Sequence, residues 1–415
     1  MSSTAPLPAF SAVGIELELM IVDADSLSVR PIADELLRAE CGRYECEIER
    51  GDVAWSNELV AHLVELKTNG PRAGLEGLAD AFQREVDHIQ TRLEPPGARL
   101  LGTAMHPWMD PRTQTQLWRH ENAEVYALFD RIFDCRHHGW ANVQSVHINL
   151  PFADDDEFGR LHAAIRTVLP LLPALAASSP VVDGRLGHLL DNRLEAYRRH
   201  AAKIPEISGA VIPEPVYTRA DYERLLDGIH AAVAPHDPDG VMRHEWINAR
   251  GAIARFDRHA IEIRLLDVQE TPEADMAIAA AVIAVVRALY EERFVAIEEL
   301  KAWQTDRLKT LLAATARDGE AAVIRDLPFL ELFRFPHSGP CEAWELWQHL
   351  LDHVMDDSER AAHAAPLERI FAQGTLARRI VQAIGGDRRR ERLHEVYTEL
   401  ADCLASRRLF DVATP

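Results

Sequence analysis

Long hydrophobic runs are missing from this chain of 415 residues. The longest apolar run, Met276 to Val286, covers 11 residues between Asp275 and Arg287, whereas a membrane-spanning helix needs about 20. Hydrophobic residues make up 47% of the sequence and charged residues 27%, which is ordinary for a soluble globular protein. The composition therefore excludes disordered and collagen-like chains, and we expect no membrane partner.

Positive charge is also scarce. The 45 lysines and arginines are outnumbered by 66 aspartates and glutamates, and the formal net charge is −21. Such a surface repels nucleic acid unless a local basic stripe overrides it. The dense basic clusters, at 198–199 and 388–392, are short and carry no interleaved aromatic residue. We expect no nucleic-acid partner, and an acidic enzyme with anionic substrates must collect positive charge at its site.

Cysteines and phosphate-binding glycine loops are rare or absent. The five cysteines are odd in number and match no zinc spacing, and neither a GxxxxGK[ST] loop nor a GxGxxG turn after a strand is found. The first ten residues have no basic start and no apolar run, so they do not resemble a signal peptide. A reducing cytoplasm is the simplest expected compartment.

Periodic patterns predict the order of the elements. Alternation predicts strands at 12–23, 98–103, 143–150 and 259–267, and either a strand or a short helix at 57–68. Spacings of three and four predict helices at 74–93, 154–175, 219–233 and 271–294, with further helices to the end. Because the two types do not alternate strictly, we expect an α+β fold with an antiparallel or mixed sheet and helices on one side. We expect one catalytic domain, 1–415, with a sheet-bearing core at 12–295 and a helical part at 296–415 packed on it.

The polar faces of these strands carry the informative residues. Glu16 and Glu18 share one face of a strand whose other face is aliphatic. Two carboxylates about 7 Å apart along a strand repel each other unless cations or donors lie between them. Three further pairs follow the same pattern: Glu262 with Arg264, His147 with Asn149 and, less clearly, Glu65 with Lys67.

A wet face is normal for any single antiparallel strand, and each pair has that ordinary explanation. The set as a whole favours a metal site, because a solvated face usually mixes Lys, Thr, Ser and Arg. Carboxylates suit Mg²⁺ together with phosphate oxygens, and a histidine ligand would also suit Mn²⁺. We therefore predict a cluster on the sheet that binds Mg²⁺ and a nucleotide, with phosphates neutralised by metal and arginine.

Six blocks of the sequence resemble those of one known family, in its order: 14–18 (GIELE), 64–68 (VELKT), 102–108 (GTAMHPW), 145–152 (SVHINLPF), 178–185 (SSPVVDGR) and 260–282 (AIEIRLLDVQETPEADMAIAAAV). The family is that of glutamate–cysteine ligase, especially its bacterial type 2 carboxylate–amine ligase branch. Ser145 stands where the family has a first histidine. The resemblance implies a glutamine synthetase-like fold, in which a curved antiparallel sheet forms a funnel-shaped active site with helices outside.

The resemblance also implies a reaction and roles for residues. ATP would phosphorylate the γ-carboxylate of glutamate, and an amine such as cysteine would attack, releasing ADP and phosphate. By position, the implied metal ligands are Glu16, Glu18, Glu65, His147 and Glu262. The implied catalytic residues are Arg264, Glu262 and Arg185, and the nucleotide would meet Glu16, Glu18, Arg264 and Arg193. Substrate would contact Arg185, Arg193, His106 and Asn149. The expected partners are an amino acid, an amine and a second copy in a homodimer.

Some assignments stay open at this point. Strict alternation places Asp267 on the aliphatic face, so either a bulge re-aims it or it is structural, and we favour the structural role. Glu58 is either a marginal metal ligand or an exposed acid, and we favour the exposed acid. His106 either lines the pocket or is buried and hydrogen-bonded. Two other functions are considered: a regulatory protein that binds nucleotide or amino acid without turnover, and a different metal-dependent enzyme in the same funnel.

Overall fold

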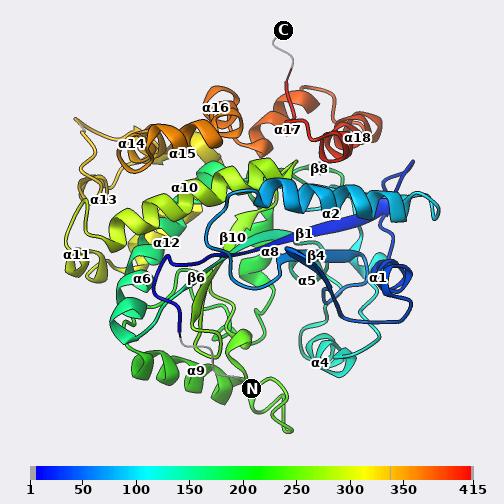
Figure 1. Cartoon of the computed structure of the whole chain (residues 1–415), viewed down its shortest axis with the longest axis horizontal. Helices are drawn as coiled ribbons and strands as arrows, with labels where there is room; N and C mark the ends of the chain where they lie inside the picture. The colour runs from blue at the N-terminus through cyan, green and yellow to red at the C-terminus, as the bar shows by residue number, and fades with distance from the viewer. Residues whose placement is uncertain (1–5, 337, 413–415) are drawn as a thin grey trace.

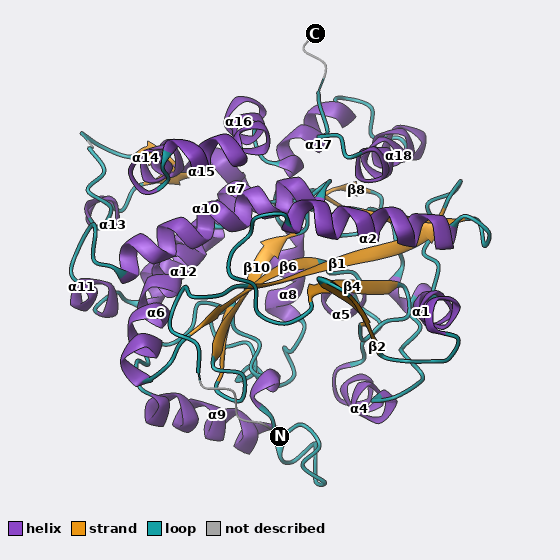
Figure 2. Cartoon of the chain, viewed as in Figure 1, coloured by secondary structure: helices purple, strands orange, loops and turns teal. Residues whose placement is uncertain are grey.

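A computed structural model describes residues 6–336 and 338–412. Its centre is an eight-stranded sheet (Figures 1 and 2). The sheet contains β1 (Gly14–Asp23), β2 (Glu47–Arg50), β3 (Val53–Asn57), β4 (Leu63–Thr68), β5 (Ala98–Leu101), β6 (Ser145–Pro151), β9 (Ala252–Arg255) and β10 (Ala260–Asp267). The strand order is β2-β3-β4-β1-β6-β10-β9, with β5 also paired to β1, and every pairing between these strands is antiparallel. The predicted α+β class is confirmed.

Strand β1 organises the sheet because it has three neighbours. One of its edges pairs with β4. The other edge is divided: β6 pairs with residues 14–17, and β5 pairs with residues 20–23. The ten-residue length of β1 allows this division, which lets β6 and β10 continue away from β5 with one face free for polar side chains.

Helices cover the aliphatic face. The helices before residue 295 are α1 (Ala33–Cys41), α2 (Leu78–Leu93), α3 (Pro111–Gln114), α4 (Ala123–Phe133), α5 (His138–Ala141), α6 (Asp155–Val168), α7 (Pro173–Ala176), α8 (Asn192–Arg199), α9 (Arg219–Val233) and α10 (Pro272–Tyr290), with 3₁₀ turns η1 (Leu169–Leu171) and η2 (Glu245–Ile247). Figure 1 shows α2 and α10 lying across one side of the sheet, with α4 and α9 on the other. Ile15, Ile148 and Ile263 of the sheet share one buried core with Phe82 of α2 and Val282 of α10.

The C-terminal part is helical and packs on α2 and α10 (Figure 2). It contains α11 (Ile297–Lys301), α12 (Thr305–Asp318), η3 (Gly319–Ala321), α13 (Leu327–Glu331), α14 (Ala343–Val354), α15 (Asp357–Ala362), α16 (Ala364–Gln373), α17 (Leu376–Ile384) and α18 (Arg390–Ser406). A short ladder of β11 (Val323–Ile324) with β12 (Cys341–Glu342) interrupts it, where the sequence predicted helices alone. Within residues 6–336 and 338–412, no helix has the length and apolar character needed to cross a membrane.

Local signals in the sequence explain where α10 and α6 begin. The hydroxyl of Thr271 accepts a hydrogen bond from the backbone N of Ala274, and Pro272 occupies the first helical position. Asp154 caps α6 by accepting from the backbone N of Glu157 at 3.0 Å. Segment 57–68, left open as strand or helix, contains the end of β3 and all of β4. The short strands β2, β3 and β9 were missed, as was the ladder of β7 (Val181–Val182) with β8 (Arg185–Leu186).

Candidate active site

The strand register brings acidic side chains together on the polar face. Glu18 of β1 pairs with Glu65 of β4, and Glu16 of β1 pairs with His147 of β6. Glu262 of β10 approaches the same strand β6 from its other edge. Directly opposed residues have Cβ atoms about 5 Å apart. Side chains from four strands therefore converge, although they come from segments up to 246 residues apart in the sequence.

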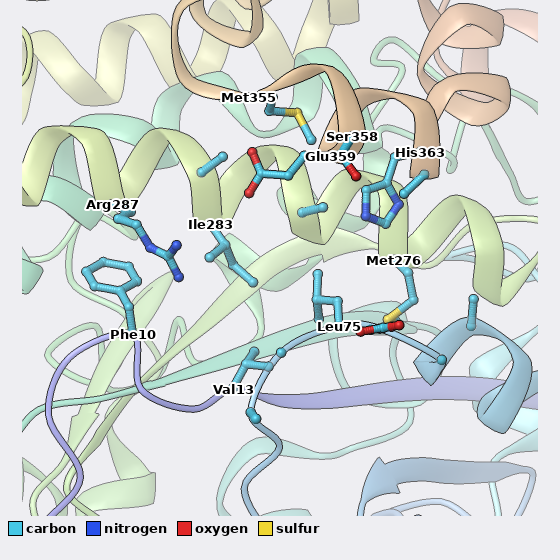
Figure 3. A pocket seen from close by; sticks show the side chains of 18 of the residues that line it. Phe10, Val13, Leu75, Met276, Ile283, Arg287, Met355, Ser358, Glu359 and His363 are labelled. Atoms are coloured by element: carbon cyan, nitrogen blue, oxygen red, sulfur yellow. The ribbon is translucent and has the colours of Figure 1, made fainter.

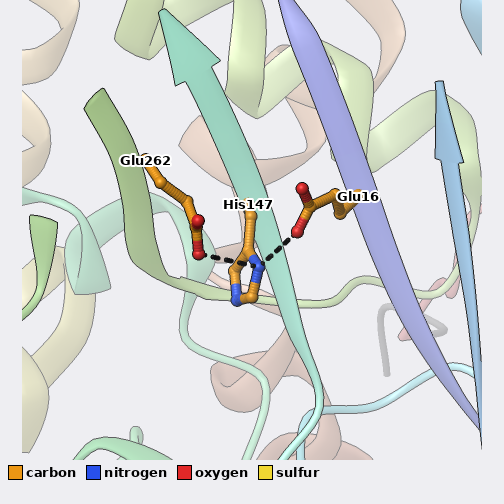
Figure 4. Close-up of side chains that lie close together, drawn as sticks. All are labelled: Glu16, His147 and Glu262. Atoms are coloured by element: carbon orange, nitrogen blue, oxygen red, sulfur yellow. Dashed lines mark hydrogen bonds and ion pairs between the residues drawn. The ribbon is translucent and has the colours of Figure 1, made fainter. Parts of the chain in front are cut away.

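The first group of ligand atoms lies around Nδ1 of His147 (Figure 4). Nδ1 of His147 lies 2.8 Å from Oε2 of Glu16 and 3.6 Å from Oε1 of Glu262. Asn149, two residues after His147 on β6, donates from Nδ2 to Oε1 of Glu16 at 3.0 Å. One ligand atom from each of Glu16, His147 and Glu262 lies within 4.8 Å of the others. A single cation could contact all three.

The second group shares the same histidine. Ligand atoms of Glu18, Glu65 and His147 also lie within 4.8 Å of one another, and Nε2 of His147 is 3.8 Å from Oε1 of Glu18. Ser145 fixes the carboxylate of Glu18, because its backbone N and its Oγ both donate to Oε2, at 2.7 and 2.8 Å. Ser56 of β3 donates from Oγ to Oε1 of Glu65 at 2.6 Å. Both carboxylates are therefore held in place by hydroxyl donors.

The pKa values show how these charges compensate one another. Burial alone would raise the pKa of Glu16, but the hydrogen bond and the charge of His147 lower it to about 2. Burial would lower the pKa of His147, and the hydrogen bond of Glu16 and the charge of Glu18 raise it instead. Burial and the charge of Glu16 raise the pKa of Glu65 to about 6, although Lys67, whose Nζ lies 3.4 Å from Oε1 of Glu65, opposes the rise. The cluster thus holds more carboxylate than its own cations neutralise.

Glu58 belongs to the same acidic cluster, which corrects the expectation of an exposed acid. It lies in the loop between β3 and β4 and is half-buried. It lines the same cavity as Glu18. Burial, and then the charges of Glu65 and Glu18, raise the pKa of Glu58 well above its usual value. Sequence alternation could not find this residue, because it follows a strand that was not predicted and lies outside any regular pattern.

Arg264 supplies positive charge at the edge of the acidic cluster. Its Nε lies 3.0 Å from Oε1 of Glu262, and the two residues share the polar face of β10. Burial would lower the pKa of Arg264, but Tyr197 and Glu262 raise it, so the guanidinium stays charged. Together with Glu18, Glu58 and His147 it lines a cavity of about 250 Å³. Carboxylates, a histidine and an arginine thus meet in one hollow.

A family model described as "Glutamate-cysteine ligase family 2" matches residues 12–399. The chain belongs to this family. Among its relatives, an uncharacterised protein of Archaeoglobus fulgidus is 35% identical over 280 residues, which cover 68% of this chain and 75% of the relative. A "Putative glutamate--cysteine ligase 2" of Corynebacterium glutamicum is 24% identical over 324 residues, covering 76% and 77%. One of the same name from Clavibacter michiganensis is 27% identical, and the match spans about half of each chain, 54% and 55%.

Solved structures show that the fold is shared. A glutamate–cysteine ligase from Francisella tularensis in complex with AMP gives a TM-score of 0.58 with 13% identity, over 97% of this chain and 90% of that one. A bifunctional glutathione synthetase from Pasteurella multocida gives 0.56 with 17% identity, over 96% of this chain and 52% of that one. The predicted family and fold are confirmed, and so is the prediction of an ATP-dependent ligase that forms a carbon–nitrogen bond.

The acidic residues of this family member fit a hard divalent cation. Oxygen atoms predominate in both groups of ligand atoms, which share one histidine residue, His147, and hard cations prefer oxygen ligands. Burial and the charge of Glu16 raise the pKa of Glu65, and a bound cation would favour its ionised form. A cation would also displace the proton of His147, because metal ligands must be deprotonated.

A bulge in β10 settles the place of Asp267. The register with β6 shifts between Ile263 and Leu266, so that Asp267 pairs with Ser145 on the polar face. Its carboxylate accepts from the backbone N of Ser178 at 2.8 Å and lies 3.2 Å from Nη1 of Arg193. Both alternatives considered from the sequence therefore apply: a bulge re-aims the side chain, and its contacts are structural. Arg193 lines the cavity, but this ion pair already binds its guanidinium.

Three of the four residues assigned to substrate by resemblance, Arg185, His106 and Asn149, do not line the cavity. Arg185 is exposed on β8 and does not line it. His106 is completely buried, and its Nε2 donates to the backbone O of Leu27 at 2.7 Å, while its Nδ1 accepts from the backbone N of Trp108. Of the two readings left open for His106, the geometry supports the buried, hydrogen-bonded one. Desolvation lowers the pKa of its imidazole to about 3, so the ring is neutral.

A larger cavity lies on the aliphatic side of the sheet (Figure 3). Its volume is about 700 Å³, and Figure 3 shows Val13 and Leu75 facing Met276 and Ile283 of α10 across it. No predicted metal ligand is among the described residues that line it. Size alone therefore does not identify the active site. Arg287, Glu359 and His363 line this cavity, whereas the predicted metal ligands converge on the opposite face of the sheet.

Proposed function

We propose that this chain is a ligase that uses ATP to activate the γ-carboxylate of glutamate and joins it to an amine. The observation that carries the proposal is the convergence of Glu16, Glu65 and Glu262 on His147, from four strands. His147 and Arg264, which is paired with Glu262, also line the adjacent cavity. Relatives named as glutamate–cysteine ligases and the AMP-bound neighbour support the nucleotide and the amino-acid donor.

The reaction consists of two balanced transfers. A carboxylate oxygen of glutamate attacks the γ-phosphorus of ATP, and the bond from that phosphorus to the oxygen of ADP breaks, giving an acyl phosphate. The nitrogen of the amine then attacks the carbonyl carbon, phosphate leaves, and the nitrogen loses one proton to form the amide. Phosphoryl transfer between anions requires positioning and neutralisation of charge more than a protein nucleophile.

The residues of the polar face match these requirements. Mg²⁺, or Mn²⁺, would be held by the carboxylates and histidine of the two ligand groups and would, when bound, neutralise phosphate charge. Arg264 is placed to bind a phosphoryl oxygen pair, which a guanidinium does in a bidentate manner. Ser145 and Ser56 hold Glu18 and Glu65 in position. Rigid β-strands carry all of these groups, so little reorganisation is needed during reaction.

A hydroxylamine trapping assay tests the proposal. Purified protein is incubated with ATP, MgCl₂, glutamate and hydroxylamine, a small nucleophile that converts an acyl phosphate into a hydroxamate. We expect ADP and glutamyl hydroxamate to form together, and only when all four components are present. Arg264→Lys should lose most of this activity, since a point charge cannot replace the guanidinium fork.

Other outcomes would favour the alternatives. Tight ATP binding by calorimetry without any ADP release, with hydroxylamine or with a panel of amines, would indicate a binding or regulatory protein of the same fold. Hydrolysis of an amide without ATP would indicate a metal-dependent hydrolase. Either result would contradict the proposed ligase.

A further inference from the structure

The cavity beside the acidic cluster continues to an aromatic wall. Tyr126 and Phe129 of α4, Trp140 of α5 and Trp246 of η2 all line it, as do two acidic residues, Glu18 and Glu58. The ring of Phe129 lies 5.1 Å from that of Trp140 and 5.7 Å from that of Trp246, between ring centres. Helices α4 and α5, which are close in the sequence, and the distant turn η2 thus present aromatic rings to the same cavity. This wall has no role in holding metal or phosphate.

Few charged groups are left in this cavity for the head group of an amino acid. Its positively charged lining residues are Arg193, His147 and Arg264. Arg193 is bound to Asp267 at 3.2 Å, and His147 contacts Glu16 at 2.8 Å. Arg264 is required by the phosphoryl group under the proposed function.

His200, which also lines the cavity, does not add a cation. Burial lowers the pKa of His200 to about 4, so its ring is neutral. An amine that carries a carboxylate would therefore place that anion against the aromatic wall with no free cation to pair with it, and burying an unpaired anion is strongly unfavourable. An uncharged, apolar substituent meets no such penalty.

The volume of the cavity limits the size of the amine that can bind in it. At about 250 Å³ it is larger than the roughly 150 Å³ that accommodates a benzene molecule. It is smaller than the roughly 300–1,000 Å³ of typical sites for drug-sized ligands, so a nucleotide must lie largely outside it. An amine with one aromatic ring and a short aliphatic chain fits. The chain would direct its amino group toward the acidic residues of the lining, beside which the acyl phosphate would form.

We propose that the acceptor is a primary amine with an aromatic or similarly flat apolar group and no carboxylate, seated against Tyr126, Phe129, Trp140 and Trp246. This proposal rests on the proposed function and specifies its amine. Offset or edge-to-face packing of an aromatic substrate on these rings adds to the area that it buries.

The test compares matched amines in the ATP- and glutamate-dependent assay. 2-Phenylethylamine and phenylalanine differ by one carboxylate, and 2-phenylethylamine and propylamine differ mainly by the ring. We expect kcat/KM for 2-phenylethylamine to exceed that for phenylalanine, cysteine and propylamine by about tenfold or more, which corresponds to ~1.4 kcal/mol. Equal or better use of cysteine or phenylalanine would overturn the proposal.

Hydroxylamine distinguishes a failure of this proposal from a failure of the proposed function, because it is too small to depend on contact with the aromatic wall. Hydroxamate formation without a preference for 2-phenylethylamine would refute the amine class and leave the ligase intact. Absence of hydroxamate would refute both.

Trp246→Ala provides a second test, with Trp344→Ala as its matched control. Both tryptophans are half-buried, but Trp344 lies on α14 and does not line the cavity. We expect Trp246→Ala to lower the ratio of kcat/KM for 2-phenylethylamine to that for hydroxylamine about tenfold, and Trp246→Phe to restore most of it. Trp344→Ala should leave the ratio unchanged. An unchanged ratio in Trp246→Ala would contradict the proposal, even if overall activity fell.

Discussion

The central sheet excludes most solvent from the middle of both faces, but the two faces have different roles. On one face Ile148 is 0% exposed beneath helices, and on the other His147 is 5% exposed and Glu262 is 6% exposed. Burial of the isoleucine stabilises the fold, whereas burial of charged groups costs free energy that ion pairing only partly returns. Two adjacent residues of β6 therefore have different roles: Ile148 contributes to the stability of the fold, and His147 contributes to the candidate active site. The predictions below test this division.

The largest expected effect concerns Glu262 on the polar face. Glu262→Gln keeps the size of the side chain but removes one anionic ligand from the group around His147. We expect kcat in the hydroxamate assay to fall by about 10³-fold or more, in the range seen when one electrostatic stabiliser is lost, while the melting temperature changes by only a few degrees.

Glu273→Gln is the matched control for this change. Glu273 is exposed at the start of α10 and lines the larger cavity on the other face. Its activity should stay near that of the wild type. Normal activity in Glu262→Gln would show that this carboxylate is not needed and would remove the basis of the metal assignment.

The second prediction addresses the aliphatic face. Ile148→Ala leaves a cavity under the helices, because Ile148 is packed with Ile15 and Ile263 in the main core. We expect the free energy of unfolding to fall by about 2–5 kcal/mol, measured by urea denaturation. Below its unfolding transition the variant should keep KM and kcat within a few-fold. A loss of activity without a loss of stability would mean that the two faces are not separable.

The third prediction contrasts two buried histidines. Contacts with acids raise the pKa of His147, whereas burial and the charge of Arg166 lower the pKa of His162 of α6 to about 3. The unfolded chain takes up a proton near pH 6.5 and the folded one only near pH 3, so this histidine makes stability fall as the pH is lowered through that window.

Between pH 6.5 and pH 5 this difference amounts to about 2 kcal/mol. His162→Phe, which replaces the imidazole with a ring that does not titrate, should flatten the pH dependence of the unfolding free energy by that amount. Denaturation curves at the two pH values measure it. An identical slope in both proteins would show that His162 is not neutral in the fold.

The sequence predicted those parts of the site that follow from strict alternation. Period two in β1, β6 and β10 was enough to place Glu16, Glu18, His147 and Glu262 on polar faces, and antiparallel pairing then brought them together. The α+β class followed from the same patterns. Resemblance to the family contributed the chemistry, which no periodicity contains.

The features of the site that the sequence did not predict depend on contacts between distant segments. The bulge that turns Asp267 to the polar face is set by pairing between β10 and β6, and alternation within β10 alone gave the wrong face. Glu58 joins the cluster through a loop whose course is determined by β3 and β4. The aromatic wall combines α4 and α5 with η2, which lies far later in the sequence, and no local pattern indicates that η2 approaches them.

The smallest expected effect concerns Arg185, where resemblance and geometry differ. The resemblance assigned it to substrate, yet it is exposed on β8 and does not line the cavity that Arg264 lines. We expect Arg185→Ala to change kcat/KM for glutamate by less than about threefold, because an exposed charge away from the reacting groups contributes little. Under the same conditions Arg264→Ala should be nearly inactive. A loss of 100-fold or more in Arg185→Ala would show that the β7–β8 ladder closes over the polar face when substrates bind, and the site would then extend beyond the cavity described here.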